Sequence, residues 1–260
     1  LRFPVRYRAA VKAAGEILDR ARADVAVGFG GFASTPIYAA AKKRGIPVVI
    51  HEQNAKPGLA NKYGVRFAAG VGLTFPSTPL RAKVGRTEVV GLPLRQSISD
   101  LAAARGDQGG ARAARVAAAS VLGLDPDMTT LVVTGGSLGA QHLNEVLVAA
   151  RHLMKDVQVL HLTGRDKDAP VRDAVVGMHH YHVRDYMSDM ENAYAVADMV
   201  VCRSGAGTVA ELGALGIPAL FVPLPIGNGE QELNAADVVK AGGAILFRNA
   251  DFTVQVVESD

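Results

Sequence analysis

Short runs of consecutive aliphatic and β-branched residues constrain the fold of this chain more than any other feature. They lie within 24–28, 46–50, 130–134, 199–202 and 218–222, and a further strand is expected at 157–162, where Gln158 and His161 interrupt the apolar residues. Continuous apolar runs, as opposed to alternating apolar and polar residues, are typical of parallel strands that are covered on both faces of a sheet. Stretches with helical spacing separate the runs, so the sequence predicts an α/β protein with parallel sheets.

The order of these elements predicts two domains in a chain of 260 residues. Helices are expected at 5–22, 35–44, 140–153, 209–215 and 231–241, and further strands at 72–74, 88–90 and 244–247. The stretch 96–119 is rich in Ala, Arg and Gly, which is typical of a linker followed by a surface helix. We therefore expect a Rossmann-like domain at 1–95, a linker with a surface helix at 96–124, a second Rossmann-like domain at 125–260, and a cleft between the domains.

Composition excludes several classes of protein. The chain has 28 Lys and Arg against 25 Asp and Glu, and the resulting charge of +3 is concentrated near its start. No zinc finger or RNP-like aromatic motif is present, so no nucleic-acid partner is expected. The single cysteine, Cys202, cannot form an internal disulfide, which favours a reducing compartment. No apolar run reaches the roughly 18 residues of a membrane span, and no signal peptide is expected.

A glycine-rich turn at 134–140 (TGGSLGA) follows a predicted strand and precedes a predicted helix. Its glycines allow backbone N–H groups to approach an anion, and the helix dipole attracts negative charge. The turn is neither a Walker A loop nor a strict GxGxxG motif. Phosphate binding and a tight turn without a ligand therefore both remain open.

A second turn, CRSGAGT at 202–208, also joins a strand to a helix. Thr208 and Glu211 match the Thr-x-x-Glu capping box, which is the simpler interpretation of both residues. In the alternative, Glu211 accepts hydrogen bonds from a ribose diol. Gln231 and Asn234 share a face of a predicted helix, where two carboxamides could bind sugar hydroxyls or be ordinary solvated residues.

Polar residues in the first domain follow the strand at 46–50. The tetrapeptide HEQN (51–54) comes directly after this strand, and the turn GFGGFAS (28–34) is expected beside it. Ligands of open α/β sheets bind outside the carboxyl ends of the strands. His51 could therefore act as a base, with a structural histidine as the alternative.

Other motifs carry less information. His180 and His182 share a strand face but need a third ligand, and Asp125-Pro-Asp127 and Asp166-Lys-Asp168 are typical of turns or helix starts, so no metal is expected. Near the start, Phe3 and Tyr7 are spaced i,i+4 with arginines beside them. That pattern fits an anionic bilayer surface and equally a solvated amphipathic helix.

Together these motifs resemble one family closely. The stretches that carry the resemblance are 28–34, 46–62 (IPVVIHEQNAKPGLANK), 89–95 (VVGLPLR), 133–144 (VTGGSLGAQHLN), 200–212 (VVCRSGAGTVAEL) and 223–235 (PLPIGNGEQELNA). They are similar to motifs of the bacterial N-acetylglucosaminyltransferases of peptidoglycan synthesis, the MurG family, and resemble actinobacterial members in particular. The resemblance implies a GT-B fold, UDP-N-acetylglucosamine as donor, lipid I (undecaprenyl-pyrophosphoryl-MurNAc-pentapeptide) as acceptor and lipid II as product.

The resemblance also implies roles for residues at matching positions. On the donor side these are Gly136, Ser137 and Gly139 for the diphosphate, Arg95 and Tyr186 for the nucleotide, Glu211 for the ribose, and Ala206, Thr208, Gln231 and Asn234 for the N-acetylglucosamine. On the acceptor side they are Gly30, Gly31 and Ser34, with His51, Glu52 and Asn54 as the catalytic candidates. Leu1, Phe3 and Tyr7 match a membrane-associating patch.

The implied reaction is an inverting displacement at the anomeric carbon. A base takes the proton of the acceptor 4-hydroxyl, which attacks C1 as UDP leaves. Helix dipoles and backbone amides would stabilise the diphosphate, so neither a metal nor a cofactor is expected. The implied location is the cytoplasmic face of the bacterial cell membrane as a peripheral protein, with cell-wall and division proteins as further partners.

The chain departs from the family pattern at both ends. The family's first strand with its glycine-rich loop and its closing helical segment are not in the sequence, and Gly207 stands where a larger apolar residue is common. We therefore expect a truncated chain that binds the donor weakly and turns over little substrate, although the full-length protein is active. The alternatives are another GT-B enzyme that uses UDP-sugars, such as an epimerase, and a non-catalytic nucleotide-sugar-binding module.

Overall fold

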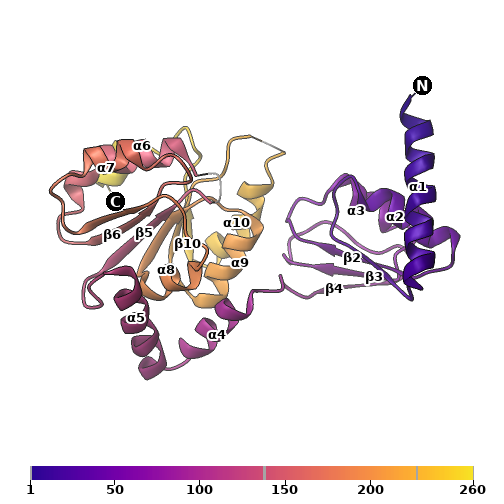
Figure 1. Cartoon of the computed structure of the whole chain (residues 1–260), viewed down its shortest axis with the longest axis horizontal. Coiled ribbons are helices and arrows are strands. Elements are labelled where there is room, and N and C mark those ends of the chain that lie inside the picture. Colours follow the sequence, from indigo (N-terminus) through magenta and orange to yellow (C-terminus); the bar gives the residue numbers. More distant parts are fainter. Residues whose placement is uncertain (1, 137–138, 227, 260) are drawn as a thin grey trace. The chain divides into compact units, whose positions relative to one another are not determined.

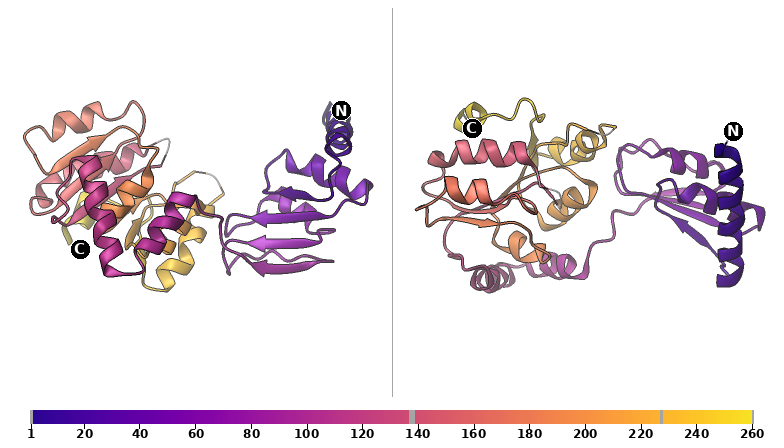
Figure 2. Two further views of the ribbon diagram at one scale, coloured as in Figure 1. Left: turned by 60° about the horizontal axis from the view of Figure 1, so that its bottom comes forward. Right: turned by 45° about the horizontal axis from the view of Figure 1, so that its top comes forward.

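A computed structural model describes residues 2–136, 139–226 and 228–259 (Figures 1 and 2). The chain divides into two compact units, Leu1–Pro93 and Leu94–Asp260. Each unit contains its own parallel sheet. The predicted α/β class is confirmed.

The first unit has a four-stranded sheet in the order β1-β2-β3-β4. The strands are β1 (Ala26–Gly28), β2 (Val48–Glu52), β3 (Gly70–Leu73) and β4 (Arg86–Val89). The helices are α1 (Arg2–Ala21), α2 (Ser34–Lys43) and α3 (Leu59–Gly64). Val11, Ala14 and Leu18 lie on one face of α1 and are buried, which is why this helix packs against α2.

The other face of this sheet does not match the expectation of cover on both sides. Val27 in β1 is 53% exposed, and Phe29 and Val90, which follow β1 and β4, are 56% and 57% exposed. Among the described residues of this unit, the helices pack on the opposite face only (Figure 2). The apolar runs of β1 and β4 therefore meet side chains on one side alone.

The second unit has a six-stranded sheet in the order β10-β9-β8-β5-β6-β7. Its strands are β5 (Thr130–Thr134), β6 (Gln158–Leu162), β7 (Tyr181–Arg184), β8 (Met199–Cys202), β9 (Ala219–Phe221) and β10 (Ala244–Leu246). The predicted bounds of β5 and β8 are confirmed, because adjacent side chains of both strands are buried on opposite faces.

Helices cover both faces of this second sheet (Figure 1). They are α4 (Gln96–Ala104), α5 (Gln108–Leu122), α6 (Gln141–Ala149), α7 (Ala169–Ala174), α8 (Met190–Val196), α9 (Ala206–Leu215), α10 (Glu230–Lys240) and α11 (Val254–Ser259), with a 3₁₀ turn at Arg151–Leu153. The stretch expected to be a linker and one surface helix forms α4 and α5, which pack against α8. No helix in the described part of the chain is long and apolar enough to cross a bilayer.

A buried histidine makes the stability of the second unit depend on pH. His161 in β6 has no exposed surface, and burial lowers its pKa from 6.5 to about 4. Between these values the unfolded chain binds a proton at this residue and the folded protein does not. Stability conferred by the neutral histidine is therefore present above pH 6.5 and decreases as the pH falls towards 4.

We predict that this residue makes the free energy of unfolding about 2 kcal/mol lower at pH 5 than at pH 7. Urea titrations at the two pH values measure the difference. In His161→Gln, which cannot take up this proton, the pH dependence should be flatter by that amount. An equal pH dependence in both proteins would contradict the assignment.

Candidate functional site

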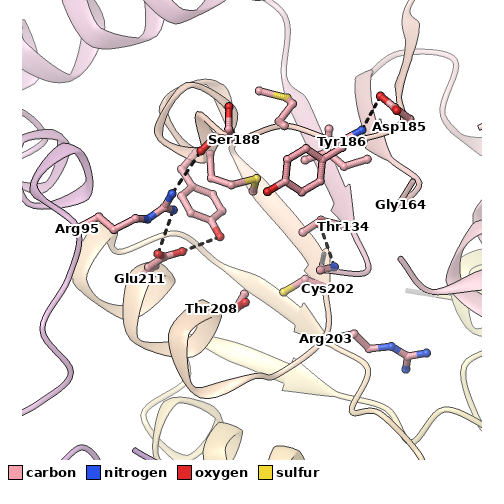
Figure 3. A pocket seen from close by; sticks show the side chains of 15 residues that line it. Arg95, Thr134, Gly164, Asp185, Tyr186, Ser188, Cys202, Arg203, Thr208 and Glu211 are labelled. Carbon is pink, nitrogen blue, oxygen red and sulfur yellow. Dashed lines mark hydrogen bonds and ion pairs between the residues drawn. The ribbon is translucent and has the colours of Figure 1, made fainter. Parts of the chain in front are cut away.

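A pocket opens where the strand order of the second sheet reverses. β5 has β6 on one side and β8 on the other, and Thr134 pairs with Cys202 at the carboxyl ends of β5 and β8. Ligands of open α/β sheets bind at such a point. The lining includes Arg95, Gly136, Tyr186, Thr208 and Glu211, which are five of the predicted donor residues (Figure 3).

Gly136, in the glycine-rich turn after β5, lines this pocket. Gly136 and Gly139 have φ values of +79° and +67°, which favour glycine. The N–H of Gly136 donates to Thr134 Oγ1 at 3.2 Å, and that of Gly139 donates to the Gly136 carbonyl at 2.9 Å. The predicted phosphate ligand Ser137 lies outside the described residues.

Helix α6 follows this turn and begins without a side-chain cap. Its N-cap residue, Ala140, has no side-chain oxygen to accept from the backbone N–H groups of the first turn. Those N–H groups, together with the helix dipole, attract an anion. The start of α6 can therefore hold the charged part of a ligand whose remainder occupies the pocket.

The capping-box interpretation of Thr208 and Glu211 is wrong. Helix α9 begins at Ala206 with Gly205 as its N-cap, so Thr208 lies inside the first turn. The extended backbone of Gly205, with φ −63° and ψ 148°, sets this earlier start. Both side chains are therefore available to the pocket, which they line.

The carboxylate of Glu211 is held from two sides. Its Oε1 forms an ion pair with Arg95 Nη2 at 3.1 Å, and its Oε2 accepts from the Tyr194 hydroxyl at 3.1 Å (Figure 3). Burial, followed by the charge of Glu211, raises the pKa of Tyr194, so its hydroxyl keeps the proton that it donates. Each carboxylate oxygen still has a lone pair that could accept from a vicinal diol.

Arg95 and Tyr186 define the other side of the pocket. Arg95 Nη1 also donates to the Ser188 carbonyl at 3.4 Å. The Tyr186 N–H donates to Asp185 Oδ1 at 2.7 Å, and the Arg165 guanidinium lies 4.3 Å from the centre of the Tyr186 ring. Charged side chains thus hold the segment after β7, which carries the residue predicted to contact the nucleotide.

The residues predicted to bind the sugar are not all in this lining. Asn234 is fully buried, and its Nδ2 donates to the Ser204 carbonyl at 3.4 Å. Gln231 Oε1 accepts from the Leu224 N–H at 3.0 Å. These contacts fasten the start of α10 to its neighbours, and Ala206 and Gly139 likewise lie outside the residues that line the pocket.

Sequence reasoning missed Tyr194 and Arg203 among the residues that line this site. Tyr194 lies 17 residues from the carboxylate that it contacts, in a stretch without a motif. Arg203 follows β8, and its Nη1 donates to the carbonyls of Val222 and Pro223 at 2.8 and 3.0 Å. The signal for Arg203 was an arginine directly after a predicted buried strand, because arginine is rarely buried unless it is paired.

In the first unit, Glu52 is the centre of a buried cluster. His51 and Glu52 belong to β2 itself, whereas the sequence placed them after the strand. Glu52 accepts from the N–H groups of Asn54 and Gly58 at 3.1 and 3.0 Å and from Asn61 Nδ2 at 2.8 Å. Three donors on one buried carboxylate indicate that Glu52 holds the following loop in place.

The glycine turn of the first unit reaches the same cluster. Asn61 Oδ1 accepts from the Tyr38 hydroxyl at 2.9 Å, and Asn61 also lies against Gly30. Gly30 and Gly31 have φ values of +88° and +79°, and the Ser34 hydroxyl donates to the Gly30 carbonyl. The structure thus brings the predicted acceptor residues of both segments together around one asparagine.

The His51 ring is held by the backbone on one side. Its Nε2 lies 2.8 Å from the Gly91 carbonyl, which can only accept, so this nitrogen carries the proton. Nδ1 is buried with no hydrogen-bond partner in the described part of the chain, and the ring contacts Phe29. Nε2 is therefore engaged by the backbone and Nδ1 is buried, and the role of His51 as a base stays a prediction.

The motifs that suggested metal sites have structural roles. Asp125 Oδ1 accepts from the Asp127 N–H at 2.8 Å, and Asp168 is the N-cap residue of α7, so the predicted turn and helix start are confirmed. Within the described residues, no three His, Cys, Asp or Glu side chains gather as a metal-binding group.

The chain is similar to known glycosyltransferases in both of its units. The glycosyltransferase family 28 N-terminal domain matches residues 1–73, and the family 28 C-terminal domain matches residues 130–259. A protein of Nocardioides sp. (strain ATCC BAA-499 / JS614) is 51% identical over 99% of this chain and 68% of its own length. Its name is UDP-N-acetylglucosamine–N-acetylmuramyl-(pentapeptide) pyrophosphoryl-undecaprenol N-acetylglucosamine transferase. The chain belongs to the MurG family.

Further relatives agree with this membership. A Streptomyces coelicolor protein of the same name is 47% identical over 99% of the chain and 68% of its own length. The crystal structure of Acinetobacter baumannii MurG superposes with a TM-score of 0.76 at 29% identity, over 99% of this chain and 68% of that one. The predicted GT-B fold and MurG-family membership are therefore confirmed.

An epimerase shares only the fold. The UDP-GlcNAc 2-epimerase from Neisseria meningitidis superposes with a TM-score of 0.67, over 97% of this chain and 71% of that one, but at 12% identity. The much higher identity to MurG-family proteins separates the chain from this alternative.

The Glu52 cluster leads to a prediction about local stability. Glu52→Ala removes the acceptor for the Asn54 and Gly58 amides, so both amides should exchange their hydrogens at least about tenfold faster. Hydrogen exchange followed by NMR measures this. In the control variant His51→Gln the Glu52 contacts remain, and protection at these amides should persist. Unchanged exchange in Glu52→Ala would show that the carboxylate does not hold the loop.

Proposed function

We propose that this chain acts in the transfer of N-acetylglucosamine from UDP-N-acetylglucosamine to the 4-hydroxyl of undecaprenyl-pyrophosphoryl-MurNAc-pentapeptide. The names of its MurG-family relatives support this activity. The observation that carries the proposal is the pocket at the strand reversal. A fixed carboxylate lines this pocket together with Gly136, which belongs to the turn that leads to the uncapped start of α6. The start of α6 would bind an anion and Glu211 would bind a diol. A nucleoside diphosphate contains both groups in one molecule.

The donor fits this pocket in one direction. The ribose hydroxyls would donate to Glu211, the uracil ring would lie near Tyr186, and the diphosphate would reach the start of α6. A base takes the proton of the acceptor 4-hydroxyl, and the oxygen bonds to C1 as the bond from C1 to the β-phosphate oxygen breaks. The electron pair of the broken bond leaves with UDP. The dipole and N–H groups of α6 stabilise the charge that develops on the leaving diphosphate, so we propose that neither a metal nor a cofactor is needed for this step.

The acceptor side would use the first unit. Glu52 fixes the loop 53–58, and Asn61 joins this loop to the turn with Gly30 and Ser34. The oxygens of Glu52 already accept hydrogen bonds from Asn54 and Gly58 in this loop. We therefore propose that Glu52 and Asn54 position the acceptor. Gln231 and Asn234 would act on the donor sugar through the loop and helix that they hold.

The start of α1 supports a peripheral attachment to the membrane. Phe3 is 78% exposed, and its ring stacks on Tyr7 with the centroids 6.1 Å apart. Arg6 and Arg8 beside them are exposed. An exposed aromatic ring flanked by arginines favours the interface of an anionic bilayer, and Leu1 of the predicted patch lies outside the described residues.

The donor assignment predicts the effect of changing Glu211. Glu211→Gln removes the charge that strengthens the ribose hydrogen bonds, so affinity for UDP-N-acetylglucosamine should fall about tenfold in calorimetric titrations. Tyr194→Phe is the matched control, because it removes one contact to Glu211 and leaves the carboxylate in place; the loss should stay within a few-fold. Equal affinity in Glu211→Gln and the unaltered chain would exclude this ribose site.

The membrane assignment is tested with vesicles. Phe3→Ser should weaken co-sedimentation with phosphatidylglycerol vesicles about tenfold, because one buried aromatic ring contributes about 1.5–3 kcal/mol. Val121→Ser on α5, which is also an exposed apolar position, should leave binding unchanged. Equal losses in both variants, or none in Phe3→Ser, would contradict the assignment.

A further inference from the structure

A buried chain of polar groups connects β7, β6 and α6 in the second unit. His161 Nδ1 lies 2.8 Å from the Tyr181 hydroxyl, and His161 Nε2 lies 3.0 Å from Asn144 Oδ1. Asn144 Nδ2 in turn donates to the Thr163 carbonyl at 3.1 Å. His161 and Thr163 have no exposed surface, and Asn144 and Tyr181 are each 6% exposed. The four groups therefore depend on one another for hydrogen bonds.

The Thr163 carbonyl, the last of these polar groups, fixes the direction of each hydrogen bond. The Thr163 carbonyl can only accept, so the amide nitrogen of Asn144 faces it and the amide oxygen faces His161. His161 Nε2 must then carry the proton, and Nδ1 accepts from the Tyr181 hydroxyl. A neutral imidazole in a single tautomer satisfies both neighbours, and the lowered pKa of His161 agrees with a neutral ring.

Thr163, the last of these polar groups, supports the glycine-rich turn next to the pocket. A Cβ on Gly139 would lie 2.3 Å from the Thr163 carbonyl oxygen and 2.8 Å from Gly164 Cα, so Gly139 packs directly against this backbone. Gly139 is hydrogen-bonded to Gly136, which lines the pocket, as does Gly164. A shift of Thr163 would therefore move the turn.

Asn144 also lies in the first turns of α6, because its N–H donates to the Ala140 carbonyl at 3.0 Å. One side chain thus ties the start of α6 to the backbone on which the glycine turn rests. The Asn144 side chain, which His161 holds by a hydrogen bond, therefore sets the distance between the start of α6 and the backbone at Thr163. Such rigid support lets a binding site keep its geometry before the ligand arrives.

We propose that His161 and Asn144 are positioning residues that hold the glycine-rich turn and the start of α6 in the geometry that binds a diphosphate. This inference rests on the proposed donor site. It assigns a role in recognition to side chains that do not touch the ligand.

The test compares two ligands that differ only in the diphosphate. Affinities for uridine and for UDP are measured by calorimetry on the same protein, and their ratio isolates the contribution of the diphosphate. In His161→Leu the preference for UDP over uridine should fall about tenfold, with the affinity for uridine changing less than about twofold. A merely structural role would lower the melting temperature and leave this ratio unchanged.

Two further variants serve as controls. Tyr181→Phe leaves the contacts from His161 through Asn144 to Thr163 in place, so it should keep the preference for UDP. His161→Gln has one donor and one acceptor and should restore part of the preference lost in His161→Leu; it also provides the measurement if His161→Leu does not fold, because it should then show an intermediate ratio.

The outcomes separate this inference from the function on which it rests. An unaltered preference for UDP in folded His161→Leu, or in His161→Gln where His161→Leu does not fold, overturns the positioning role and leaves the donor site intact. An unaltered chain that binds uridine and UDP equally well overturns the donor site, and the positioning role with it. A loss of preference as large in Tyr181→Phe as in His161→Leu overturns the role of the Asn144 contact.

Discussion

The parallel pairing of β5 with β8 is the interaction on which the proposed donor site depends. Because Thr134 and Cys202 are paired, the chain leaves both strands at the same edge of the sheet. The glycine-rich turn then leads into α6, and the turn at Ser204 and Gly205 leads into α9. Two turns that leave neighbouring strands for different helices leave space between them, and the pocket occupies that space. The chemistry follows from the groups that the two turns and the helices after them carry.

Each of those groups is held by a contact between residues distant in sequence. Glu211 is fixed by Arg95, 116 residues away, and by Tyr194. The glycine-rich turn rests on the backbone after β6, which Asn144 and His161 hold in place. The same principle operates in the first unit, where Asn61 joins Glu52 to Tyr38. In both units a buried polar side chain fixes a loop at the carboxyl edge of a parallel sheet.

The fold could be predicted from the sequence wherever burial on both faces produces a continuous apolar run. β5 and β8 were placed to the residue for this reason, whereas β7, with only Tyr181 and Val183 buried, was less evident. The start of α9 was misplaced, because Thr208 and Glu211 have the spacing of a capping box and the pattern alone does not show that Gly205 already caps the helix. Local spacing gives the period of a helix more reliably than its first residue.

The site was predicted as a set of positions, and its contacts were not. Resemblance predicted roles for Arg95 and Glu211, but it did not show that they form an ion pair with each other or that Tyr194 also contacts Glu211. It also suggested that Gln231 and Asn234 read a sugar directly, whereas their side chains fasten the neighbouring loop and turn. Contacts that close over long sequence separations depend on the packed structure, so residue patterns cannot reveal them.

The most direct test of the central claim is a crystal structure of this chain soaked with UDP-N-acetylglucosamine. The account predicts electron density for the nucleotide in the pocket between β5 and β8, with the ribose hydroxyls within hydrogen-bonding distance of Glu211 and the diphosphate at the start of α6. A nucleotide bound elsewhere, or one whose ribose lies out of reach of Glu211, would contradict it.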